Sequence, residues 1–184
     1  ESRKAFAGFG DPYFSREQAA EALRSEGKLD KSAAMSNRER RTPGRPLRLR
    51  AAPRTAGLES AGLAQLPRLV DTADEIHGIA LALKADLTDD VFLGGRANEG
   101  TVKALNLSGY KVIAFATHGL VPGDLNGLTQ PALALSAPAV AGTEGDGLLT
   151  MGEILSLKLD ADWVVLSACN TGAGQGAGAE AVSG

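Results

Sequence analysis

The sequence predicts an α/β fold with a mainly parallel sheet, and two stretches carry most of that prediction. Residues 161–172, ADWVVLSACNTG, begin as a continuous apolar run and then reach the only cysteine of the chain, Cys169. Residues 111–119, KVIAFATHG, have the same design and lead to His118. Such runs are typical of strands buried on both faces of a parallel sheet. Helical patterns alternate with the strands, as an α/β fold requires.

The first third of the chain contains one strand, one helix and a long segment without periodicity. Residues 4–9 favour a strand that ends at the turn signature Gly10-Asp11-Pro12, and residues 15–25 favour a short polar helix. From about Glu26 to Gly62, proline, glycine, serine and arginine dominate. Because a compact domain seldom holds so long a structureless loop, we expect a disordered basic insertion at about 26–62.

Helices and strands alternate in the remainder. Thr72 with Glu75, and Thr150 with Glu153, have the spacing of capping boxes and predict helices at about 72–84 and from 150 onwards. Their apolar positions recur at helical spacing, as they do in a further helix expected at 98–107. Short strands are expected at 91–93, 111–117, 132–136 and 163–167, with loops at 121–130 and 137–147.

Composition narrows the class of protein. A length of 184 residues favours one domain. A single cysteine excludes an internal disulfide, and with only two histidines no zinc cluster is convincing, so we expect no metal and no cofactor. No apolar run approaches the roughly 18 residues of a membrane helix, and no signal-peptide pattern is present. These features favour a cytoplasmic protein that does not bind membranes.

The net charge of −3 conceals a basic segment. Arginines are concentrated between Arg38 and Arg54, mixed with prolines, whereas the rest of the chain has an acidic excess. Such a run can bind nucleic acid. We prefer a solvated loop and expect no nucleic-acid partner, because the segment lacks the aromatic residues on which bases stack.

Cys169 and His118 are the candidate catalytic residues. Both follow strands of the predicted sheet, and ligands bind at the carboxyl ends of the strands in open α/β sheets. A thiolate can attack a peptide carbonyl, and an imidazole can protonate the departing amine. A lone cysteine is more often a small buried apolar residue. The matching strand that leads to His118 favours catalysis instead.

These residues also carry a family resemblance, which extends over most of the chain and is weak from about 14 to 62. The chain resembles the CHAT domain, a member of the caspase-like cysteine peptidases that also include separase and gingipain. The segments that carry the likeness are GFGDP at 8–12, Leu66-Pro67 through Glu75, His118-Gly119, DGLLT at 146–150 with Glu153-Ile154, and LSACNTG at 166–172.

The resemblance implies a caspase-like three-layer sandwich with the sheet order 2-1-3-4, in which the His118 strand is third and the Cys169 strand fourth. It also implies a cysteine endopeptidase in a bacterial-type regulatory role. Cys169 is then the nucleophile and His118 the general acid/base. The N–H groups of Gly119 and Cys169 are the candidates for the oxyanion hole, where one donor is worth about 3 kcal/mol of barrier.

The resemblance further implies a helix and two more strands after Gly184. We therefore expect residues 1–184 to form a single incomplete domain whose C-terminal strands are missing, inactive alone and with the Trp163–Ser167 strand at an open edge. CHAT domains often follow helical repeats, so tetratricopeptide-type repeats are an expected partner in the parent chain.

Substrate preference and two alternative functions stay open at this point. A protein or peptide is the expected substrate, and Asp124 and Asp146, on loops near the site, are candidates for selecting a basic side chain. One alternative is a non-catalytic caspase-like scaffold, since a fold does not secure a function. The other is a nucleotide-binding α/β domain that uses the glycine-rich loop at Gly172–Gly178, where residues 174–179 match G-x-G-x-x-G/A.

Limited digestion tests the expected basic insertion. Trypsin should cut first among the arginines from Arg38 to Arg50, because a chain without periodic apolar residues makes few contacts with a core. Mass spectrometry of the early fragments would identify the sites. First cuts at Lys111 or Lys158 would show that the domain has been misread.

Overall fold

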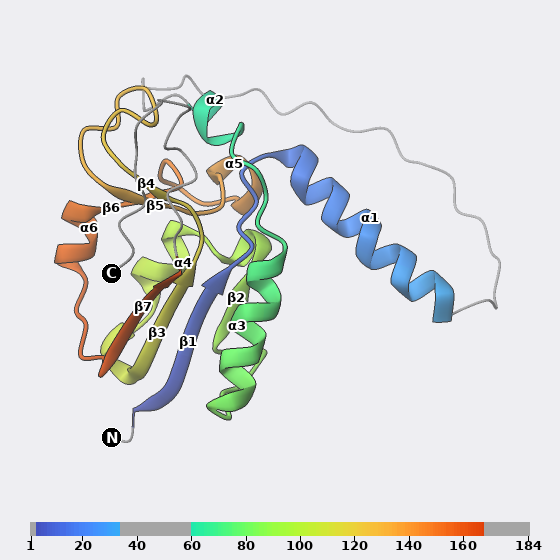
Figure 1. Ribbon diagram of the computed structural model, residues 1–184, viewed down its shortest axis with the longest axis horizontal. Helices are drawn as coiled ribbons and strands as arrows, with labels where there is room; N and C mark the ends of the chain where they lie inside the picture. Colours follow the sequence, from blue (N-terminus) through green and yellow to red (C-terminus); the bar gives the residue numbers. More distant parts are fainter. Residues whose placement is uncertain (1–2, 34–59, 168–184) are drawn as a thin grey trace, which may run out of the picture.

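The computed structural model describes residues 3–33 and 60–167, which form two sheets with helices on both faces of the larger one (Figure 1). Cys169, the glycine-rich loop at 172–178 and the arginines between 38 and 54 lie outside the described residues. The α/β class predicted from the sequence is confirmed.

The larger sheet has four parallel strands in the order β2-β1-β3-β7. Their bounds are Lys4–Gly10 for β1, Val91–Leu93 for β2, Tyr110–Ala116 for β3 and Trp163–Ser167 for β7. The order implied by the family resemblance is therefore confirmed. The strand that leads to His118 is third, and it pairs directly with the strand that leads to Cys169.

Helices cover the two faces of this sheet and give the three layers. Helix α3 (Asp71–Ala82) buries Ile76 and Ala80 against one face. Helices α4 (Glu99–Ala104) and α6 (Met151–Ser156) lie on the other face, where Val102 is buried and Ile154 packs against the same cluster. Phe9 stacks between Phe92 and Phe115 at the centre of that second face.

A second, smaller sheet lies across the carboxyl ends of the parallel strands (Figure 1). It is antiparallel in the order β4-β5-β6, with β4 at Gly119–Leu120, β5 at Ala132–Ala134 and β6 at Leu148–Thr150. Helix α5 (Pro138–Ala141) lies in the stretch expected to be only a loop. Of these elements only a strand at 132–136 was predicted, because elements of two to four residues are too short to show a period.

Both ends of the stretch expected to lack structure, about 26–62, are helical in the described residues. Helix α1 runs from Arg16 to Ala33 and extends away from the sheets (Figure 1), and helix α2 occupies Ser60–Leu63. Residues 26–33 and 60–62 therefore belong to helices, and the expected insertion between them stays a prediction. Residues 34–59, which contain the arginine cluster, lie outside the described residues.

One of the two predicted capping boxes is confirmed and the other is wrong. Thr150 and Glu153 exchange side-chain and backbone hydrogen bonds at the start of α6. Thr72, by contrast, lies inside α3, and its hydroxyl donates to the carbonyl of Leu69 while accepting the N–H of Asp11. The tertiary contact with Asp11 takes the hydroxyl that a capping box would use.

The helix expected over 98–107 is also shorter than predicted. Asn98 caps α4 through a bond from the Thr101 N–H, and the helix ends at Ala104. A 3₁₀ turn at Leu107–Gly109 then leads into β3, and another at Gly94–Arg96 follows β2. Leu105 still packs against the core, as the periodicity indicates.

Strand β7 is exposed, although its apolar run predicts burial on both faces. Trp163 is 70% exposed and Leu166 57% exposed. The strand is the last one of the sheet in the part of the chain that the structure describes, so only β3 pairs with it there. This exposure agrees with the open edge that the family resemblance implies for Trp163–Ser167, whereas the apolar run alone does not distinguish an edge strand from a central one.

Within residues 3–33 and 60–167, no helix combines the length and the apolar character that a membrane crossing requires.

The packing of α3 on β1 depends on Gly8 and can be tested by substitution. A Cβ at Gly8 would lie 2.5 Å from the Phe6 ring and 2.7 Å from Ile76. Gly8→Ala should lower the free energy of unfolding by about 1–3 kcal/mol, because the core is overpacked. Urea denaturation followed by circular dichroism measures the change.

Gly78→Ala is the matched control, since that glycine lies in α3 with open space around it. Alanine should stabilise the helix there by about 0.5–1 kcal/mol. Equal effects at the two glycines would contradict the close approach of α3 to β1.

Candidate active site

His118 follows β3 at the level where β7 also ends. Ala116 is paired with Ser167 in the parallel register, and the N–H of Thr117 donates to the Ser167 carbonyl at 3.2 Å. His118 is the second residue after Ala116, and Cys169 is the second residue after Ser167. Cys169 itself lies outside the described residues.

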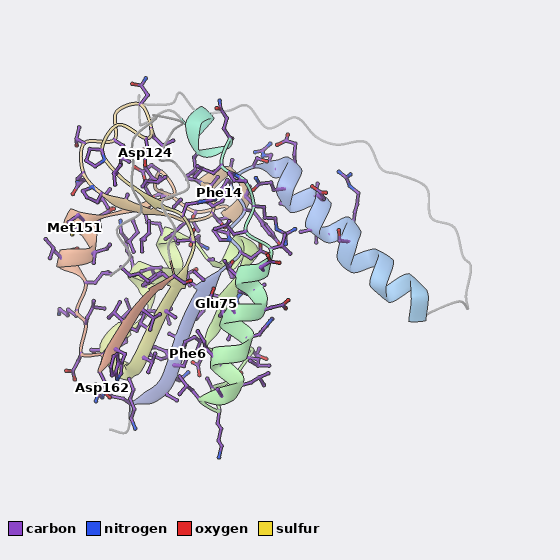
Figure 2. All side chains as sticks on the ribbon, viewed as in Figure 1. Phe6, Phe14, Glu75, Asp124, Met151 and Asp162 are labelled. Atoms are coloured by element: carbon purple, nitrogen blue, oxygen red, sulfur yellow. The ribbon has the colours of Figure 1, made fainter. Side chains whose placement is uncertain are left out.

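The imidazole of His118 is enclosed by the protein. The residue is 1% exposed, and Nε2 lies 2.8 Å from the backbone carbonyl oxygen of Pro67. A carbonyl oxygen only accepts, so Nε2 carries the proton of this hydrogen bond. The ring of Phe14 packs at 5.5 Å from the imidazole, tilted by 46°. Figure 2 shows Phe14 near the end of the sheet where β4 and β5 lie, opposite the end where Asp162 precedes β7.

The small sheet holds the backbone of the site residues. The N–H of Ala134 in β5 donates to the His118 carbonyl at 2.9 Å, and the Thr117 hydroxyl donates to the Ala134 carbonyl. Gly119 is the next residue and lies opposite Leu133. In an antiparallel ladder, successive residues alternate between facing the partner strand and facing away. The N–H of Gly119 is therefore turned away from β5.

The carbonyl that contacts His118 belongs to a short segment before α3, residues 66–69. Gln18 of α1 donates its side-chain N–H to the Leu66 carbonyl at 2.8 Å. Arg68 forms a two-pronged ion pair with Asp11, with distances of 2.7 Å from Nε and 2.5 Å from the terminal nitrogen. This hydrogen bonding to Asp11 raises the pKa of the Arg68 guanidinium above its ordinary value.

The two acidic residues considered for specificity are engaged in their own loops. A carboxylate oxygen of Asp124 accepts the N–H of Val121 at 2.8 Å, and one of Asp146 accepts the N–H of Leu148 at 2.9 Å. Figure 2 shows Asp124 on the loop beyond β4. Hydrogen bonds of this kind are typical of acidic residues that shape turns.

An apolar cavity of about 280 Å³ lies beside Gly119. Its walls come from three directions, with Leu120 and Val121 on the side of β4, Met151 and Ile154 from α6, and Leu166 from β7. Neither Asp124 nor Asp146 lines it. The described surface next to the candidate oxyanion-hole glycine is therefore apolar rather than acidic.

Sequence reasoning identified His118 but assigned no role to Pro67, Phe14, Asp11 or Arg68. Pro67 and Asp11 belong to segments that carry the family resemblance, yet nothing in their pattern indicates a contact with the histidine. A backbone carbonyl is present in every residue, so composition and spacing cannot single out the one that orients a ring. In residues 3–33 and 60–167, no group of three His, Cys, Asp or Glu side chains is arranged to hold a metal ion.

Comparison with known proteins places the chain in a family. No curated protein and no solved structure matched it. The family model described as "CHAT domain" matches residues 3–184, which is almost the whole sequence. The match includes the His118-Gly119 pair, the Pro67 segment and the Cys169 motif. The chain therefore belongs to the CHAT domain family.

Proposed function

We propose that this chain is a caspase-like cysteine peptidase domain that cleaves protein or peptide substrates. Cys169 is the nucleophile, His118 is the general acid/base, and the N–H groups of Gly119 and Cys169 bind the oxyanion. The observation that carries the proposal is the buried imidazole of His118, oriented by the Pro67 carbonyl. It lies level with the end of the strand that leads to Cys169.

The orientation of the imidazole defines its part in the reaction. In the neutral ring the proton is on Nε2 and is donated to the Pro67 carbonyl. Nδ1 is then the basic nitrogen. Nδ1 takes the proton of the Cys169 thiol, and the sulfur attacks the substrate carbonyl to form a C–S bond. The same proton then passes to the departing amine as the C–N bond breaks. Water hydrolyses the acyl-enzyme and restores the thiol.

The backbone at Gly119 supports the assignment of an oxyanion hole. Its N–H is turned away from β5, and the residue has no side chain to obstruct a substrate carbonyl. Preorganised donors of this kind stabilise the charge that develops on the carbonyl oxygen in the transition state.

For substrate preference, the cavity beside Gly119 favours an apolar side chain next to the scissile bond. Asp124 and Asp146 are weaker candidates for selecting a basic side chain, because their carboxylates already accept backbone hydrogen bonds within their loops. An apolar side chain of the substrate would remove Met151, Ile154 and Leu166 from water.

Two other functions are less well supported. A non-catalytic scaffold would not require a buried histidine with a fixed ring, since an apolar residue would fill the same space without a polar group to satisfy. Nucleotide binding through the glycine-rich loop falls on residues 172–178, which lie outside the described part of the chain.

The catalytic assignment is tested by two substitutions. Cys169→Ala should abolish peptide cleavage and labelling by an electrophilic peptide probe. His118→Ala should slow cleavage by about 10²- to 10⁴-fold while some alkylation of Cys169 persists, because general acid–base catalysis contributes on that scale. Because residues 1–184 are expected to be inactive alone, the variants are made in the parent chain. Rates are measured with a fluorogenic peptide, and the labelled residue is identified by mass spectrometry.

His77→Ala serves as the control, since it removes the other histidine, a half-buried residue of α3. Cleavage that persists in Cys169→Ala at the parent rate would refute the peptidase proposal. A parent protein that folds but neither cleaves nor reacts with the probe would support the scaffold alternative.

The apolar cavity predicts a change in selectivity for Met151→Glu. A carboxylate at the first residue of α6 suits the helix dipole, so the helix should persist, but the cavity acquires a negative charge. Cleavage of peptides with leucine next to the scissile bond should fall about tenfold relative to peptides with lysine there.

Leu155→Glu is the matched control, because that residue is on the same helix, is 78% exposed and does not line the cavity. Peptide-library profiling compares the three proteins. Identical profiles for the parent and Met151→Glu would exclude this cavity as the specificity pocket.

A further inference from the structure

We propose that the Asp11–Arg68 ion pair is a positioning element for His118: it holds the Pro67 carbonyl where that oxygen fixes the orientation of the imidazole. The inference rests on the proposed function only for its effect on catalysis. The contact that it describes, from the ion pair through Pro67 to the ring, stands on the geometry alone.

The first step is the way in which residues 66–69 are held. The Leu66 carbonyl accepts from Gln18, and the Leu69 carbonyl accepts from the Thr72 hydroxyl at 2.6 Å. Between these two anchors, the side chain of Arg68 donates two hydrogen bonds to Asp11, one to each carboxylate oxygen. A two-pronged guanidinium–carboxylate pair fixes orientation as well as distance. The peptide unit that joins Pro67 to Arg68 contains the carbonyl that contacts His118. The ion pair of Arg68 therefore constrains that carbonyl.

The second step is the anchoring of Asp11. Its backbone has a φ of 46°, in the left-handed region that aspartate tolerates better than most residues. Its N–H donates to the Thr72 hydroxyl at 2.8 Å, and its carboxylate is almost completely buried. Asp11 follows β1, the strand next to β3, so its position is tied to the same sheet that carries His118.

The third step is a second link between the Asp11–Arg68 pair and the His118 imidazole, through the residues that follow Asp11. Asp11 begins the turn that continues to Tyr13 and Phe14. The Tyr13 ring lies 4.8 Å from the Arg68 guanidinium, and the Phe14 ring packs on the His118 imidazole. The turn after β1 thus contacts His118 directly through Phe14. It also contacts His118 indirectly through Asp11, Arg68 and the Pro67 carbonyl.

The consequence is a specific role that differs from general stability. A neutral imidazole can carry its proton on either nitrogen, and the acceptor it meets selects the tautomer. If the Pro67 carbonyl shifts, the Nε2–H form loses this acceptor and the share of the Nδ1–H tautomer rises. Nδ1 is then the basic nitrogen for only part of the time, which lowers kcat more than it changes KM.

Nitrogen NMR of histidine-labelled protein tests the contact without any assay of activity. The chain has two histidines, and a His77→Gln background leaves the signals of His118 alone. At a pH where the ring is neutral, the parent should show one tautomer with the proton on Nε2. Asp11→Asn and Arg68→Lys should show averaged shifts of the two nitrogens. Both variants should also lower kcat about tenfold and change KM less than twofold.

Asp90→Asn is the matched control. The buried carboxylate of Asp90 pairs with the half-exposed Lys4 at 2.7 Å, and Asp90 lies at the opposite ends of the parallel strands. It should lower the melting temperature without altering the His118 signals or kcat. The lysine in Arg68→Lys keeps the positive charge, so that variant decides the question if Asp11→Asn does not fold.

A folded Arg68→Lys or Asp11→Asn that keeps the single Nε2–H tautomer and the parent kcat would overturn the proposal. An equal loss of kcat in Asp90→Asn would also overturn it, because the effect would then be one of stability. Mixed tautomers in the variants of a protein that cleaves no peptide would uphold the positioning contact and refute the peptidase function separately.

Discussion

The parallel pairing of β3 with β7 is the constraint on which the candidate site depends. The register places Ala116 beside Ser167, so the residues that follow the two strands start from the same level of the sheet. A slip of one residue would reverse the face of every side chain in the slipped strand. Ile113 and Phe115 on one face and Ala114 on the other are buried, so burial fixes β3 itself, and β7 takes its level from its pairing with β3 and from the Thr117–Ser167 hydrogen bond.

The second sheet and the turns around it convert a strand end into an oriented histidine. β5 fixes the backbone of His118, the turn after β1 supplies Phe14, and the segment before α3 supplies the Pro67 carbonyl. Using a carbonyl rather than a carboxylate has a physical consequence. It selects the tautomer and orientation of the ring, while adding no full negative charge to stabilise the imidazolium.

Charged side chains also hold the loop before β6 and the start of α6 in place. Glu99 is buried, accepts the N–H of Asp146 and pairs with Lys103, which also bonds Glu153. Burial would raise the pKa of Glu153, but hydrogen bonds from Lys103 and Thr150 lower it below the ordinary value. Of Glu99, Lys103 and Glu153 only Glu99 is buried, and a buried carboxylate that loses its partner is destabilising. Each of these pairs therefore constrains the position of its loop.

The sequence by itself determined the α/β class, the strands that lead to His118 and Cys169, and the start of α6 at Thr150. These features depend on apolar runs and local hydrogen bonds between residues close in the chain, which a pattern can show. Only the tertiary structure decided the use of the Thr72 hydroxyl by Asp11 and the contact of Pro67 with His118. Each of these depends on which distant segment lies alongside. A backbone carbonyl leaves no mark in a sequence, because every residue carries one.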